Sequence, residues 1–390
     1  MTRGQRTGTV FVTGGCGFVG AALVPTLLRA GHRVTVLDRM VFGSSLEPHE
    51  RLTVVEGDVR DDALLGRALP GHDAVIHLAF LSNNTSGHID PAVERAINRE
   101  ALGPMLQRCD EARVSRFVLA SSCSVYGSAT RSEVFESDAS DDPTSDYAAA
   151  KLACERLLVG HGGRMCATIV RPATVCGLSS RPRLDLTVNQ LCCRARFDRR
   201  VVIATPRRIR PVIHIHDLVR VYLALLTAPA GDVHGRAFNA AFENRTLLET
   251  ATLIADLVGD DVSVEISAEP SPDRRSYRVS SRRLHETLGF VPTHGAAEAV
   301  RELLRAIADG RLPGAPDAPR YHNHRSRPDT TGPCGREPIG HPQFSRGLSV
   351  GSRPARRGSA VPQQLLGPAH AGSDPQDRGH GHCDVRGSSK

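Results

Sequence analysis

The sequence predicts an α/β fold, a doubly wound parallel sheet followed by a smaller C-terminal α/β subdomain. Two patterns indicate it. Runs rich in β-branched residues alternate with helical patterns through the first half, and a glycine-rich turn joins the first strand to the first helix. We expect strands near residues 9–13, 33–37, 52–55, 74–77, 116–120 and 166–170, and helices near 18–30, 61–69, 90–112 and 146–160. Ligands of such sheets bind at the carboxyl ends of the strands.

The turn after the first strand has the spacing Gly14-x-x-Gly17-x-x-Gly20. Gly14 and Gly17 allow a tight turn that brings the backbone close to a pyrophosphate, and Gly20 lets the helix lie close to its strand. The helix begins with the apolar pair Phe18-Val19, and its first N–H groups are available to an anion. The turn therefore predicts a dinucleotide-binding site.

The second strand ends in Asp38, where a βαβ unit places the acid that accepts hydrogen bonds from the adenosine ribose. A carboxylate there repels a 2′-phosphate, so NAD is favoured over NADP. The neighbouring Arg39 weakens this preference.

The next two strands also end in residues that suit a dinucleotide. Asp58 follows the third strand and could accept from the adenine amino group, although an acid there could also cap the next helix, a role that Asp61 fits better. The fourth strand ends in His77-Leu78-Ala79, of which Leu78 and Ala79 form a small apolar shelf. We interpret His77 as a packed core histidine.

Polar residues after the fifth strand predict the catalytic site. The strand runs into Ser121-Ser122-Cys123-Ser124, and Tyr147-x-x-x-Lys151 follows on a helical segment. Residues at i and i+4 share one helix face. A phenol, with an ordinary pKa near 10, becomes a usable base near neutrality when cations such as Lys151 and an oxidised nicotinamide favour its phenolate. Ser122 could hydrogen-bond the same substrate hydroxyl.

These residues resemble the extended short-chain dehydrogenase/reductase superfamily, and within it the NAD-dependent epimerase/dehydratase family that acts on nucleotide sugars. The resemblance covers roughly residues 8–310 and is carried by the glycine turn, Gly57-Asp58-Val59, His77-Leu78-Ala79, Ser121-Ser122-x-x-Val125-Tyr126-Gly127, Tyr147-x-x-x-Lys151 and Arg171-Pro172-Ala173. It implies a Rossmann-type domain, NAD as cofactor and a nucleotide sugar as substrate.

The resemblance also implies roles for individual residues. Tyr147 would be the catalytic acid/base, Lys151 would bind the nicotinamide ribose and lower the tyrosine pKa, and Ser122 would assist at the reacting hydroxyl. The implied cofactor site consists of Gly14, Gly17, Phe18, Val19, Gly20, Asp38, Arg39, Asp58, Val59, Leu78, Ala79, Asn98, Tyr147, Lys151 and Pro172. The implied substrate site contains Cys123, Ser124, Arg210 and Arg275. Arginine suits a diphosphate because its planar fork binds oxygens in pairs, but a solvated surface is the alternative for both arginines.

One departure from the family pattern narrows the range of reactions that we expect. The dehydratases of the family carry an Asp-Glu pair where this chain has Cys123-Ser124, so dehydration is disfavoured. We expect an NAD-dependent nucleotide-sugar epimerase that transiently oxidises a hydroxyl, usually at C4. Relatives that epimerise at C3 and C5 use a cysteine two residues after the serine, whereas Cys123 lies one residue after it, which favours a packing role.

Three other functions stay open. The chain could be a reductase of a 4-keto nucleotide sugar, which would need added NADPH, or a dehydratase. It could also be a non-catalytic dinucleotide-sensing or interaction protein, although a sensor has no need of Ser122, Tyr147 and Lys151 together.

Composition excludes several classes of function. Of the net charge of +7, +5 lies in residues 314–390, and aromatic residues make up only 4% with no Trp, so a nucleic-acid partner is not expected. No apolar run is long enough to span a bilayer and no signal peptide precedes the first strand, so we expect no membrane partner and a cytoplasmic location. Ten scattered cysteines without a C-x-x-C pair predict reduced thiols and no metal site.

We expect three parts in the chain. Residues 1–172 would form the NAD-binding domain, and residues 173–313 mainly the substrate-binding subdomain, with some segments returning to the first sheet. In residues 314–390, 22 of 77 residues are Pro or Gly, which predicts a disordered, dispensable tail whose His380, His382 and Cys383 hold no metal. The resemblance suggests a homodimer formed through the helices near 90–112 and 146–160.

Overall fold

The computed structural model describes residues 7–82, 90–128, 132–269 and 275–323, all within one compact unit, Met1–Arg336. Seven strands form a parallel sheet in the order β11-β7-β5-β4-β1-β2-β3. The strands are β1 (Thr9–Thr13), β2 (Arg33–Asp38), β3 (Leu52–Glu56), β4 (Ala74–His77), β5 (Arg116–Ala120), β7 (Cys166–Pro172) and β11 (Arg236–Ala240). The central residues of β1, β4, β5, β7 and β11 are buried, as in a parallel sheet covered on both faces, whereas the edge strand β3 has no buried residue.

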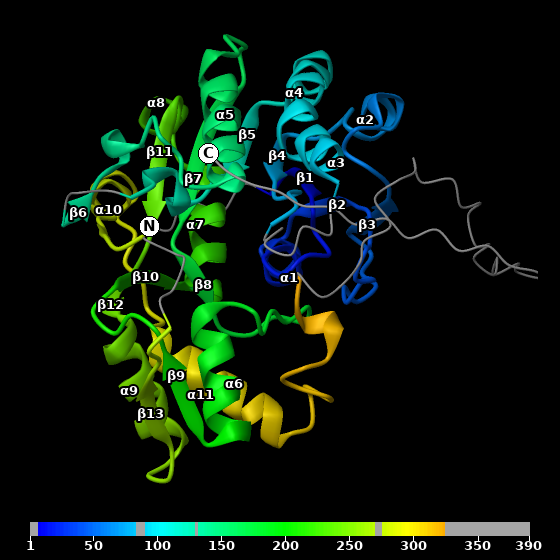
Figure 1. The fold of residues 1–390 in the computed structure, drawn as a ribbon. Coiled ribbons are helices and arrows are strands. Elements are labelled where there is room, and N and C mark those ends of the chain that lie inside the picture. The colour runs from blue at the N-terminus through cyan, green and yellow to red at the C-terminus, as the bar shows by residue number, and fades with distance from the viewer. Residues whose placement is uncertain (1–6, 83–89, 129–131, 270–274, 324–390) are drawn as a thin grey trace, which may run out of the picture. The chain divides into compact units, whose positions relative to one another are not determined.

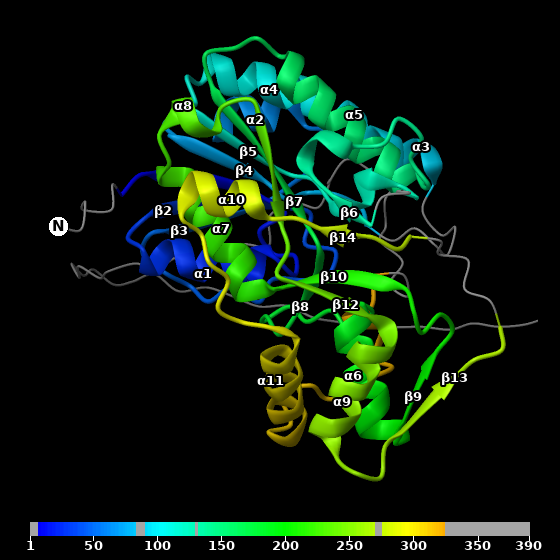
Figure 2. The same cartoon turned by 90° about the vertical axis from the view of Figure 1, so that its left-hand side faces the viewer.

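Helices cover both faces of this sheet (Figures 1 and 2). One face packs against α1 (Gly20–Arg29), α7 (Ile215–Thr227) and α10 (Arg282–Leu288). The other packs against α2 (Asp62–Ala68), α4 (Leu102–Glu111) and α5 (Asp146–Gly160). Two further helices are short. The α3 helix (Pro91–Arg95) lies in the connection between β4 and α4, and α8 (Ala230–Val233) lies between α7 and β11. The predicted doubly wound parallel sheet is confirmed.

A smaller subdomain has its own core. Three helices, α6 (Thr187–Asp198), α9 (Leu247–Val258) and α11 (Ala296–Ala308), pack together below the first sheet in Figure 1. They are accompanied by the three-stranded sheet β12-β10-β8 and by two pairs of short strands, β13-β9 and β14-β6. These strands are β6 (Glu133–Val134), β8 (Thr174–Cys176), β9 (Arg200–Ile203), β10 (Ile209–His214), β12 (Glu243–Thr246), β13 (Ser263–Ile266) and β14 (Arg278–Val279).

The chain crosses between the two parts more than once. β7 of the large sheet leads directly into β8 of the small sheet, and β11 returns to the large sheet beside β7. The carboxyl ends of the large sheet therefore face the smaller subdomain.

The α9 helix opens with a capping box, in which Thr246 Oγ1 accepts from Glu249 N at 3.0 Å and Glu249 Oε2 accepts from Thr246 N at 2.8 Å.

One predicted helix is interrupted, and one predicted boundary is wrong. The helix predicted near 90–112 runs from Pro91 to Glu111, but a π-helical turn, Ala96–Glu100, separates α3 from α4. The tail predicted from residue 314 begins too early: residues 314–323 are described, and Tyr321, only 4% exposed, packs into the core of the smaller subdomain. The high Pro and Gly content of this segment predicted disorder, so the buried position of Tyr321 was not expected.

No helix among the described residues is both long enough and apolar enough to cross a membrane.

Candidate active site

The glycine turn brings β1, α1 and β4 into close backbone contact. Gly14 has a φ of +70°, and a Cβ there would lie 2.7 Å from the Ala79 backbone nitrogen. A Cβ on Gly20 would lie 2.6 Å from the Gly14 carbonyl oxygen. Both positions therefore require glycine, and Gly14, Gly17 and Gly20 line a cavity together with Phe18 and Val19, at the N-terminus of α1.

Asp38 lies at the end of β2, beside this turn. Its carboxylate accepts from Cys16 N at 2.9 Å and from Met40 N at 2.8 Å, which fixes its orientation toward the cavity. Burial raises the pKa of Asp38, and these two amides oppose the rise. The glycine turn, the helix N-terminus and a fixed carboxylate 24 residues after Gly14 together fit a dinucleotide.

Two predicted cofactor residues lie behind the cavity wall. The Asp58 carboxylate is held by Arg60, with Nε–Oδ1 and Nη2–Oδ2 distances of 3.0 and 2.8 Å, and by Arg39 at 3.2 Å, so the neighbouring Val59 lines the cavity instead. Asn98 is 2% exposed and binds both backbone groups of Leu81. Both side chains position loops of the site.

His77 is the core residue that the sequence suggested. Its Nδ1 lies 2.8 Å from Thr13 Oγ1, and burial lowers its pKa to about 3. The following shelf, Leu78 and Ala79, lines the cavity as predicted.

The structure brings Ser122, Tyr147 and Lys151 together in one cavity of about 500 Å³. Ser122 follows β5, while Tyr147 and Lys151 lie one helical turn apart at the start of α5, whose N-cap is Ser145. Burial raises the pKa of Tyr147, whereas a hydrogen bond with Ser122 and the charges of Arg183 and Arg275 lower it. Burial is the larger effect, so the pKa of Tyr147 lies above its ordinary value in the cofactor-free chain, and these three residues reduce the rise.

Lys151 is deeply buried and is one of only two lysines in the chain, the other being Lys390. Its Nζ donates to the Ala120 carbonyl oxygen at 2.6 Å and lies 3.5 Å from the Phe80 ring centroid and 5.7 Å from that of Tyr147. Burial lowers the pKa of Lys151 to about 7. Its expected effect on the tyrosine pKa stays a prediction.

Cys123 and Ser124 occupy a short 3₁₀ turn beside the tyrosine. The Cys123 thiol donates to the Arg171 carbonyl oxygen at 3.2 Å, and burial raises its pKa far above the ordinary value, as a packing residue would show. Ser124 Oγ is buried without a hydrogen-bond partner in the described structure, and Ser124 lines the cavity. The hydroxyl of Ser124 is thus an unsatisfied buried polar group at the cavity wall.

Five arginines line the cavity, and the sequence predicted three of them, Arg39 for the cofactor and Arg210 and Arg275 for the substrate. The other two, Arg181 and Arg183, follow β8. Arg183 forms a two-point ion pair with Asp185, at 3.0 and 2.7 Å. The run Ser179-Ser180-Arg181-Pro182-Arg183 could have signalled them, since it follows a strand end, but the sequence did not predict that strand.

The last described residue also belongs to this site. Asn323 Nδ2 donates to Ser82 Oγ at 3.0 Å, and Asn323 Oδ1 accepts from Arg181 at 2.6 Å. Arg181 in turn lies 3.8 Å from the Phe42 ring centroid. The polar loop predicted at 82–87 falls outside the described residues from 83 onward.

Comparisons with known proteins agree with this geometry. A sequence model of the NAD dependent epimerase/dehydratase family matches residues 10–241. The chain is 26% identical to a UDP-glucose 4-epimerase of Azospirillum brasilense, over 78% of this chain and 95% of that one. It is 27% identical to a dTDP-glucose 4,6-dehydratase of Streptomyces niveus, over 77% and 93%.

A solved structure shares the fold at similar identity. MoeE5, in complex with UDP-glucuronic acid and NAD, superposes with a TM-score of 0.66 at 27% identity, over 77% of this chain and all of that one. Similarity therefore extends across both subdomains.

Proposed function

This chain belongs to the NAD-dependent epimerase/dehydratase family, and from that premise we propose that it is a nucleotide-sugar 4-epimerase. Its homologues are NAD-dependent enzymes, and NAD when bound supplies the group that accepts a hydride and returns it. The glycine turn and the Asp38 carboxylate are the residues that would hold NAD.

The observation that carries the proposal is the set of acids and bases in the cavity. The carboxylates among its described lining residues are Asp38, fixed by two backbone amides, and Asp185, paired with Arg183. Neither is a second acid or base beside Tyr147, and the Cys123 thiol stays protonated. Elimination of water needs a second acid or base beside Tyr147, whereas epimerisation through a ketone needs only one acid/base group.

In the proposed mechanism Tyr147 removes the proton from the sugar hydroxyl at C4 and later restores it. Ser122, hydrogen-bonded to Tyr147, holds the same hydroxyl in line with the phenol oxygen. The charge of Arg183 favours the phenolate of Tyr147.

We assign the substrate diphosphate to Arg210 and Arg275. Both line the cavity, and Arg210 donates to the Arg275 carbonyl oxygen, which keeps the two segments together. Guanidinium groups bind phosphate oxygens in pairs, so this pair would hold the nucleotide while the sugar turns within the cavity.

The test is incubation of the full chain with NAD and a panel of UDP-, GDP- and dTDP-sugars, with products analysed by mass spectrometry and NMR. We expect a product of unchanged mass with an inverted C4, formed without added NADPH. Tyr147→Phe should lower kcat at least about 100-fold because it removes the acid/base oxygen.

The outcomes separate the candidate reactions. Loss of one water would identify a dehydratase, and NADPH-dependent gain of two hydrogens would identify a reductase. If Tyr147→Phe turned over as fast as the parent, the assignment of the base would be wrong. Tyr277→Phe is a matched control, since Tyr277 also lines the cavity but its hydroxyl donates to the Cys123 carbonyl oxygen.

A further inference from the structure

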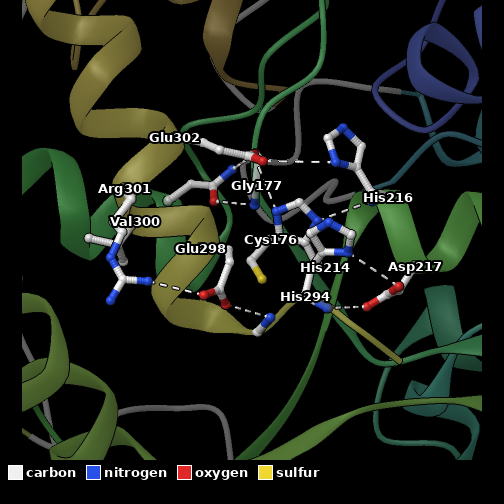
Figure 3. A network of polar contacts seen from close by, with 12 residues as sticks. Cys176, Gly177, His214, His216, Asp217, His294, Glu298, Val300, Arg301 and Glu302 are labelled. Carbon is white, nitrogen blue, oxygen red and sulfur yellow. Dashed lines mark hydrogen bonds and ion pairs between the residues drawn. The ribbon is translucent and has the colours of Figure 1, made fainter. Parts of the chain in front are cut away.

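A second cluster of polar side chains lies outside the active-site cavity, where β10, α7 and α11 meet. His214 ends β10, His216 lies in the first turn of α7, and Glu302 lies on α11. None of the three is among the described residues that line the cavity. Figure 3 shows the Glu302 carboxylate between the two imidazole rings, next to the backbone of Gly177.

The distances between these side chains suit a metal ion. His214 Nε2 lies 3.2 Å from Glu302 Oε2, and His216 Nδ1 lies 3.8 Å from Glu302 Oε1. One potential ligand atom from each residue lies within 4.8 Å of the other two. In a tetrahedral zinc site with ligands at 2.0–2.1 Å, two ligand atoms lie about 3.3 Å apart, so only small side-chain movements are needed.

The backbone keeps space open at the ligand atoms. A Cβ on Gly177 would lie 2.7 Å from His214 Nε2, so any other residue there would cover that nitrogen. The neighbouring Leu178 amide hydrogen-bonds the Glu302 carboxylate and orients it. The His216 and Glu302 side chains are 50% and 25% exposed, which leaves a route from solvent and room for a water as a fourth ligand.

Surrounding groups fix the rings. His294 stacks on His214 with centroids 5.1 Å apart, and its Nδ1 lies 3.4 Å from Asp217 Oδ1. His214 Nδ1 accepts from the His216 amide at 3.2 Å, so Nε2 carries the ring proton that faces Glu302. A metal at Nε2 takes this proton's place, and the proton moves to Nδ1 as that amide contact is released.

We propose that His214, His216 and Glu302 bind one zinc ion. The ion would have two imidazole ligands, one carboxylate and one water, and Asp217 and His294 would support the rings. Because the ligands come from β10, α7 and α11, the ion would link α11 of the smaller subdomain to the junction that leads into the large sheet. Its role would be structural, since the cluster lies outside the active-site cavity.

The test uses the full NAD-loaded chain without a polyhistidine tag, dialysed against a chelator and titrated with zinc by calorimetry. We expect one ion per chain, and with Co²⁺ as a probe we expect a visible absorption band. His216→Ala and Glu302→Gln should each weaken binding at least tenfold. The matched controls His49→Ala and Glu286→Gln change an exposed histidine and an exposed glutamate elsewhere and should bind as the parent does.

Thermal unfolding provides a second readout. Zinc should raise the unfolding temperature of the parent and leave that of Glu302→Gln unchanged. The His216→Ala variant keeps the His214–Glu302 hydrogen bond and should therefore fold. Absence of zinc binding to the parent, or equal binding by the parent and both ligand variants, would overturn the proposal and leave the cluster as a hydrogen-bonded pair.

Discussion

Lys151 is deeply buried and lines the active-site cavity proposed above, and its charge state should depend on pH near neutrality. Its pKa falls from 10.5 to about 7 because burial disfavours the ammonium. Between these values the unfolded chain binds a proton that the cofactor-free folded chain does not. The free energy of unfolding should therefore rise with pH across this window.

We expect the stability of the cofactor-free parent, relative to Lys151→Met, to rise by about 1 kcal/mol per pH unit between pH 7.5 and 9.5. Urea unfolding at several pH values measures the free energy of unfolding of both proteins. Subtracting the two values removes the contribution of the titratable groups that both proteins contain. A difference that stays flat with pH would show that the amine is still charged in the fold.

At the scale of elements, the glycine turn fixes how closely α1 approaches β1. A Cβ on Gly20 would meet backbone oxygens, which cannot move away as a flexible side chain would. Gly20→Ala should cost about 1–3 kcal/mol of stability and weaken NAD binding at least tenfold, measured by urea unfolding and by calorimetry. Gly160→Ala, at the end of α5 with nothing within 4 Å, is the control and should change neither.

The elements that the sequence predicted well are those with strong local signals. β1, β4, β5 and α5 have the predicted bounds, because apolar runs and the Ser145 cap define them. The π-helical turn around Asn98 was not predictable, since it depends on a partner, Leu81, far from it in the chain. Arg183 was missed because the strand before it, β8, was not predicted, and Asn323 was missed because only the fold brings it to Ser82.

At the scale of the molecule, the segment that follows α11 returns to the active site. Leu312 and Tyr321 are buried in the smaller subdomain, and Asn323 contacts Ser82 in the large one. A chain that ends at Asn323 should keep its stability and its activity. A chain that ends at Gly310 should lose about 3–5 kcal/mol, because it lacks these buried side chains.

Urea unfolding and steady-state kinetics on the two shortened chains check this prediction. Equal stability of both would show that residues 311–323 contribute nothing to the core, and inactivity of the longer one would show that the tail is needed.

Self-association is a separate prediction at this scale. Leu157 and Val159 of α5 are 41% and 56% exposed, as a homodimer interface on this helix would require.

The scarcity of lysine has a practical consequence for chemistry on this protein. An amine that is half deprotonated near pH 7 is nucleophilic under mild conditions, and the only other lysine is the last residue of the chain. An acylating reagent would therefore find a single internal target, at the floor of the active site. With one internal adduct, peptide mapping of the unmutated protein would report whether a ligand occupies the cavity that Lys151 lines.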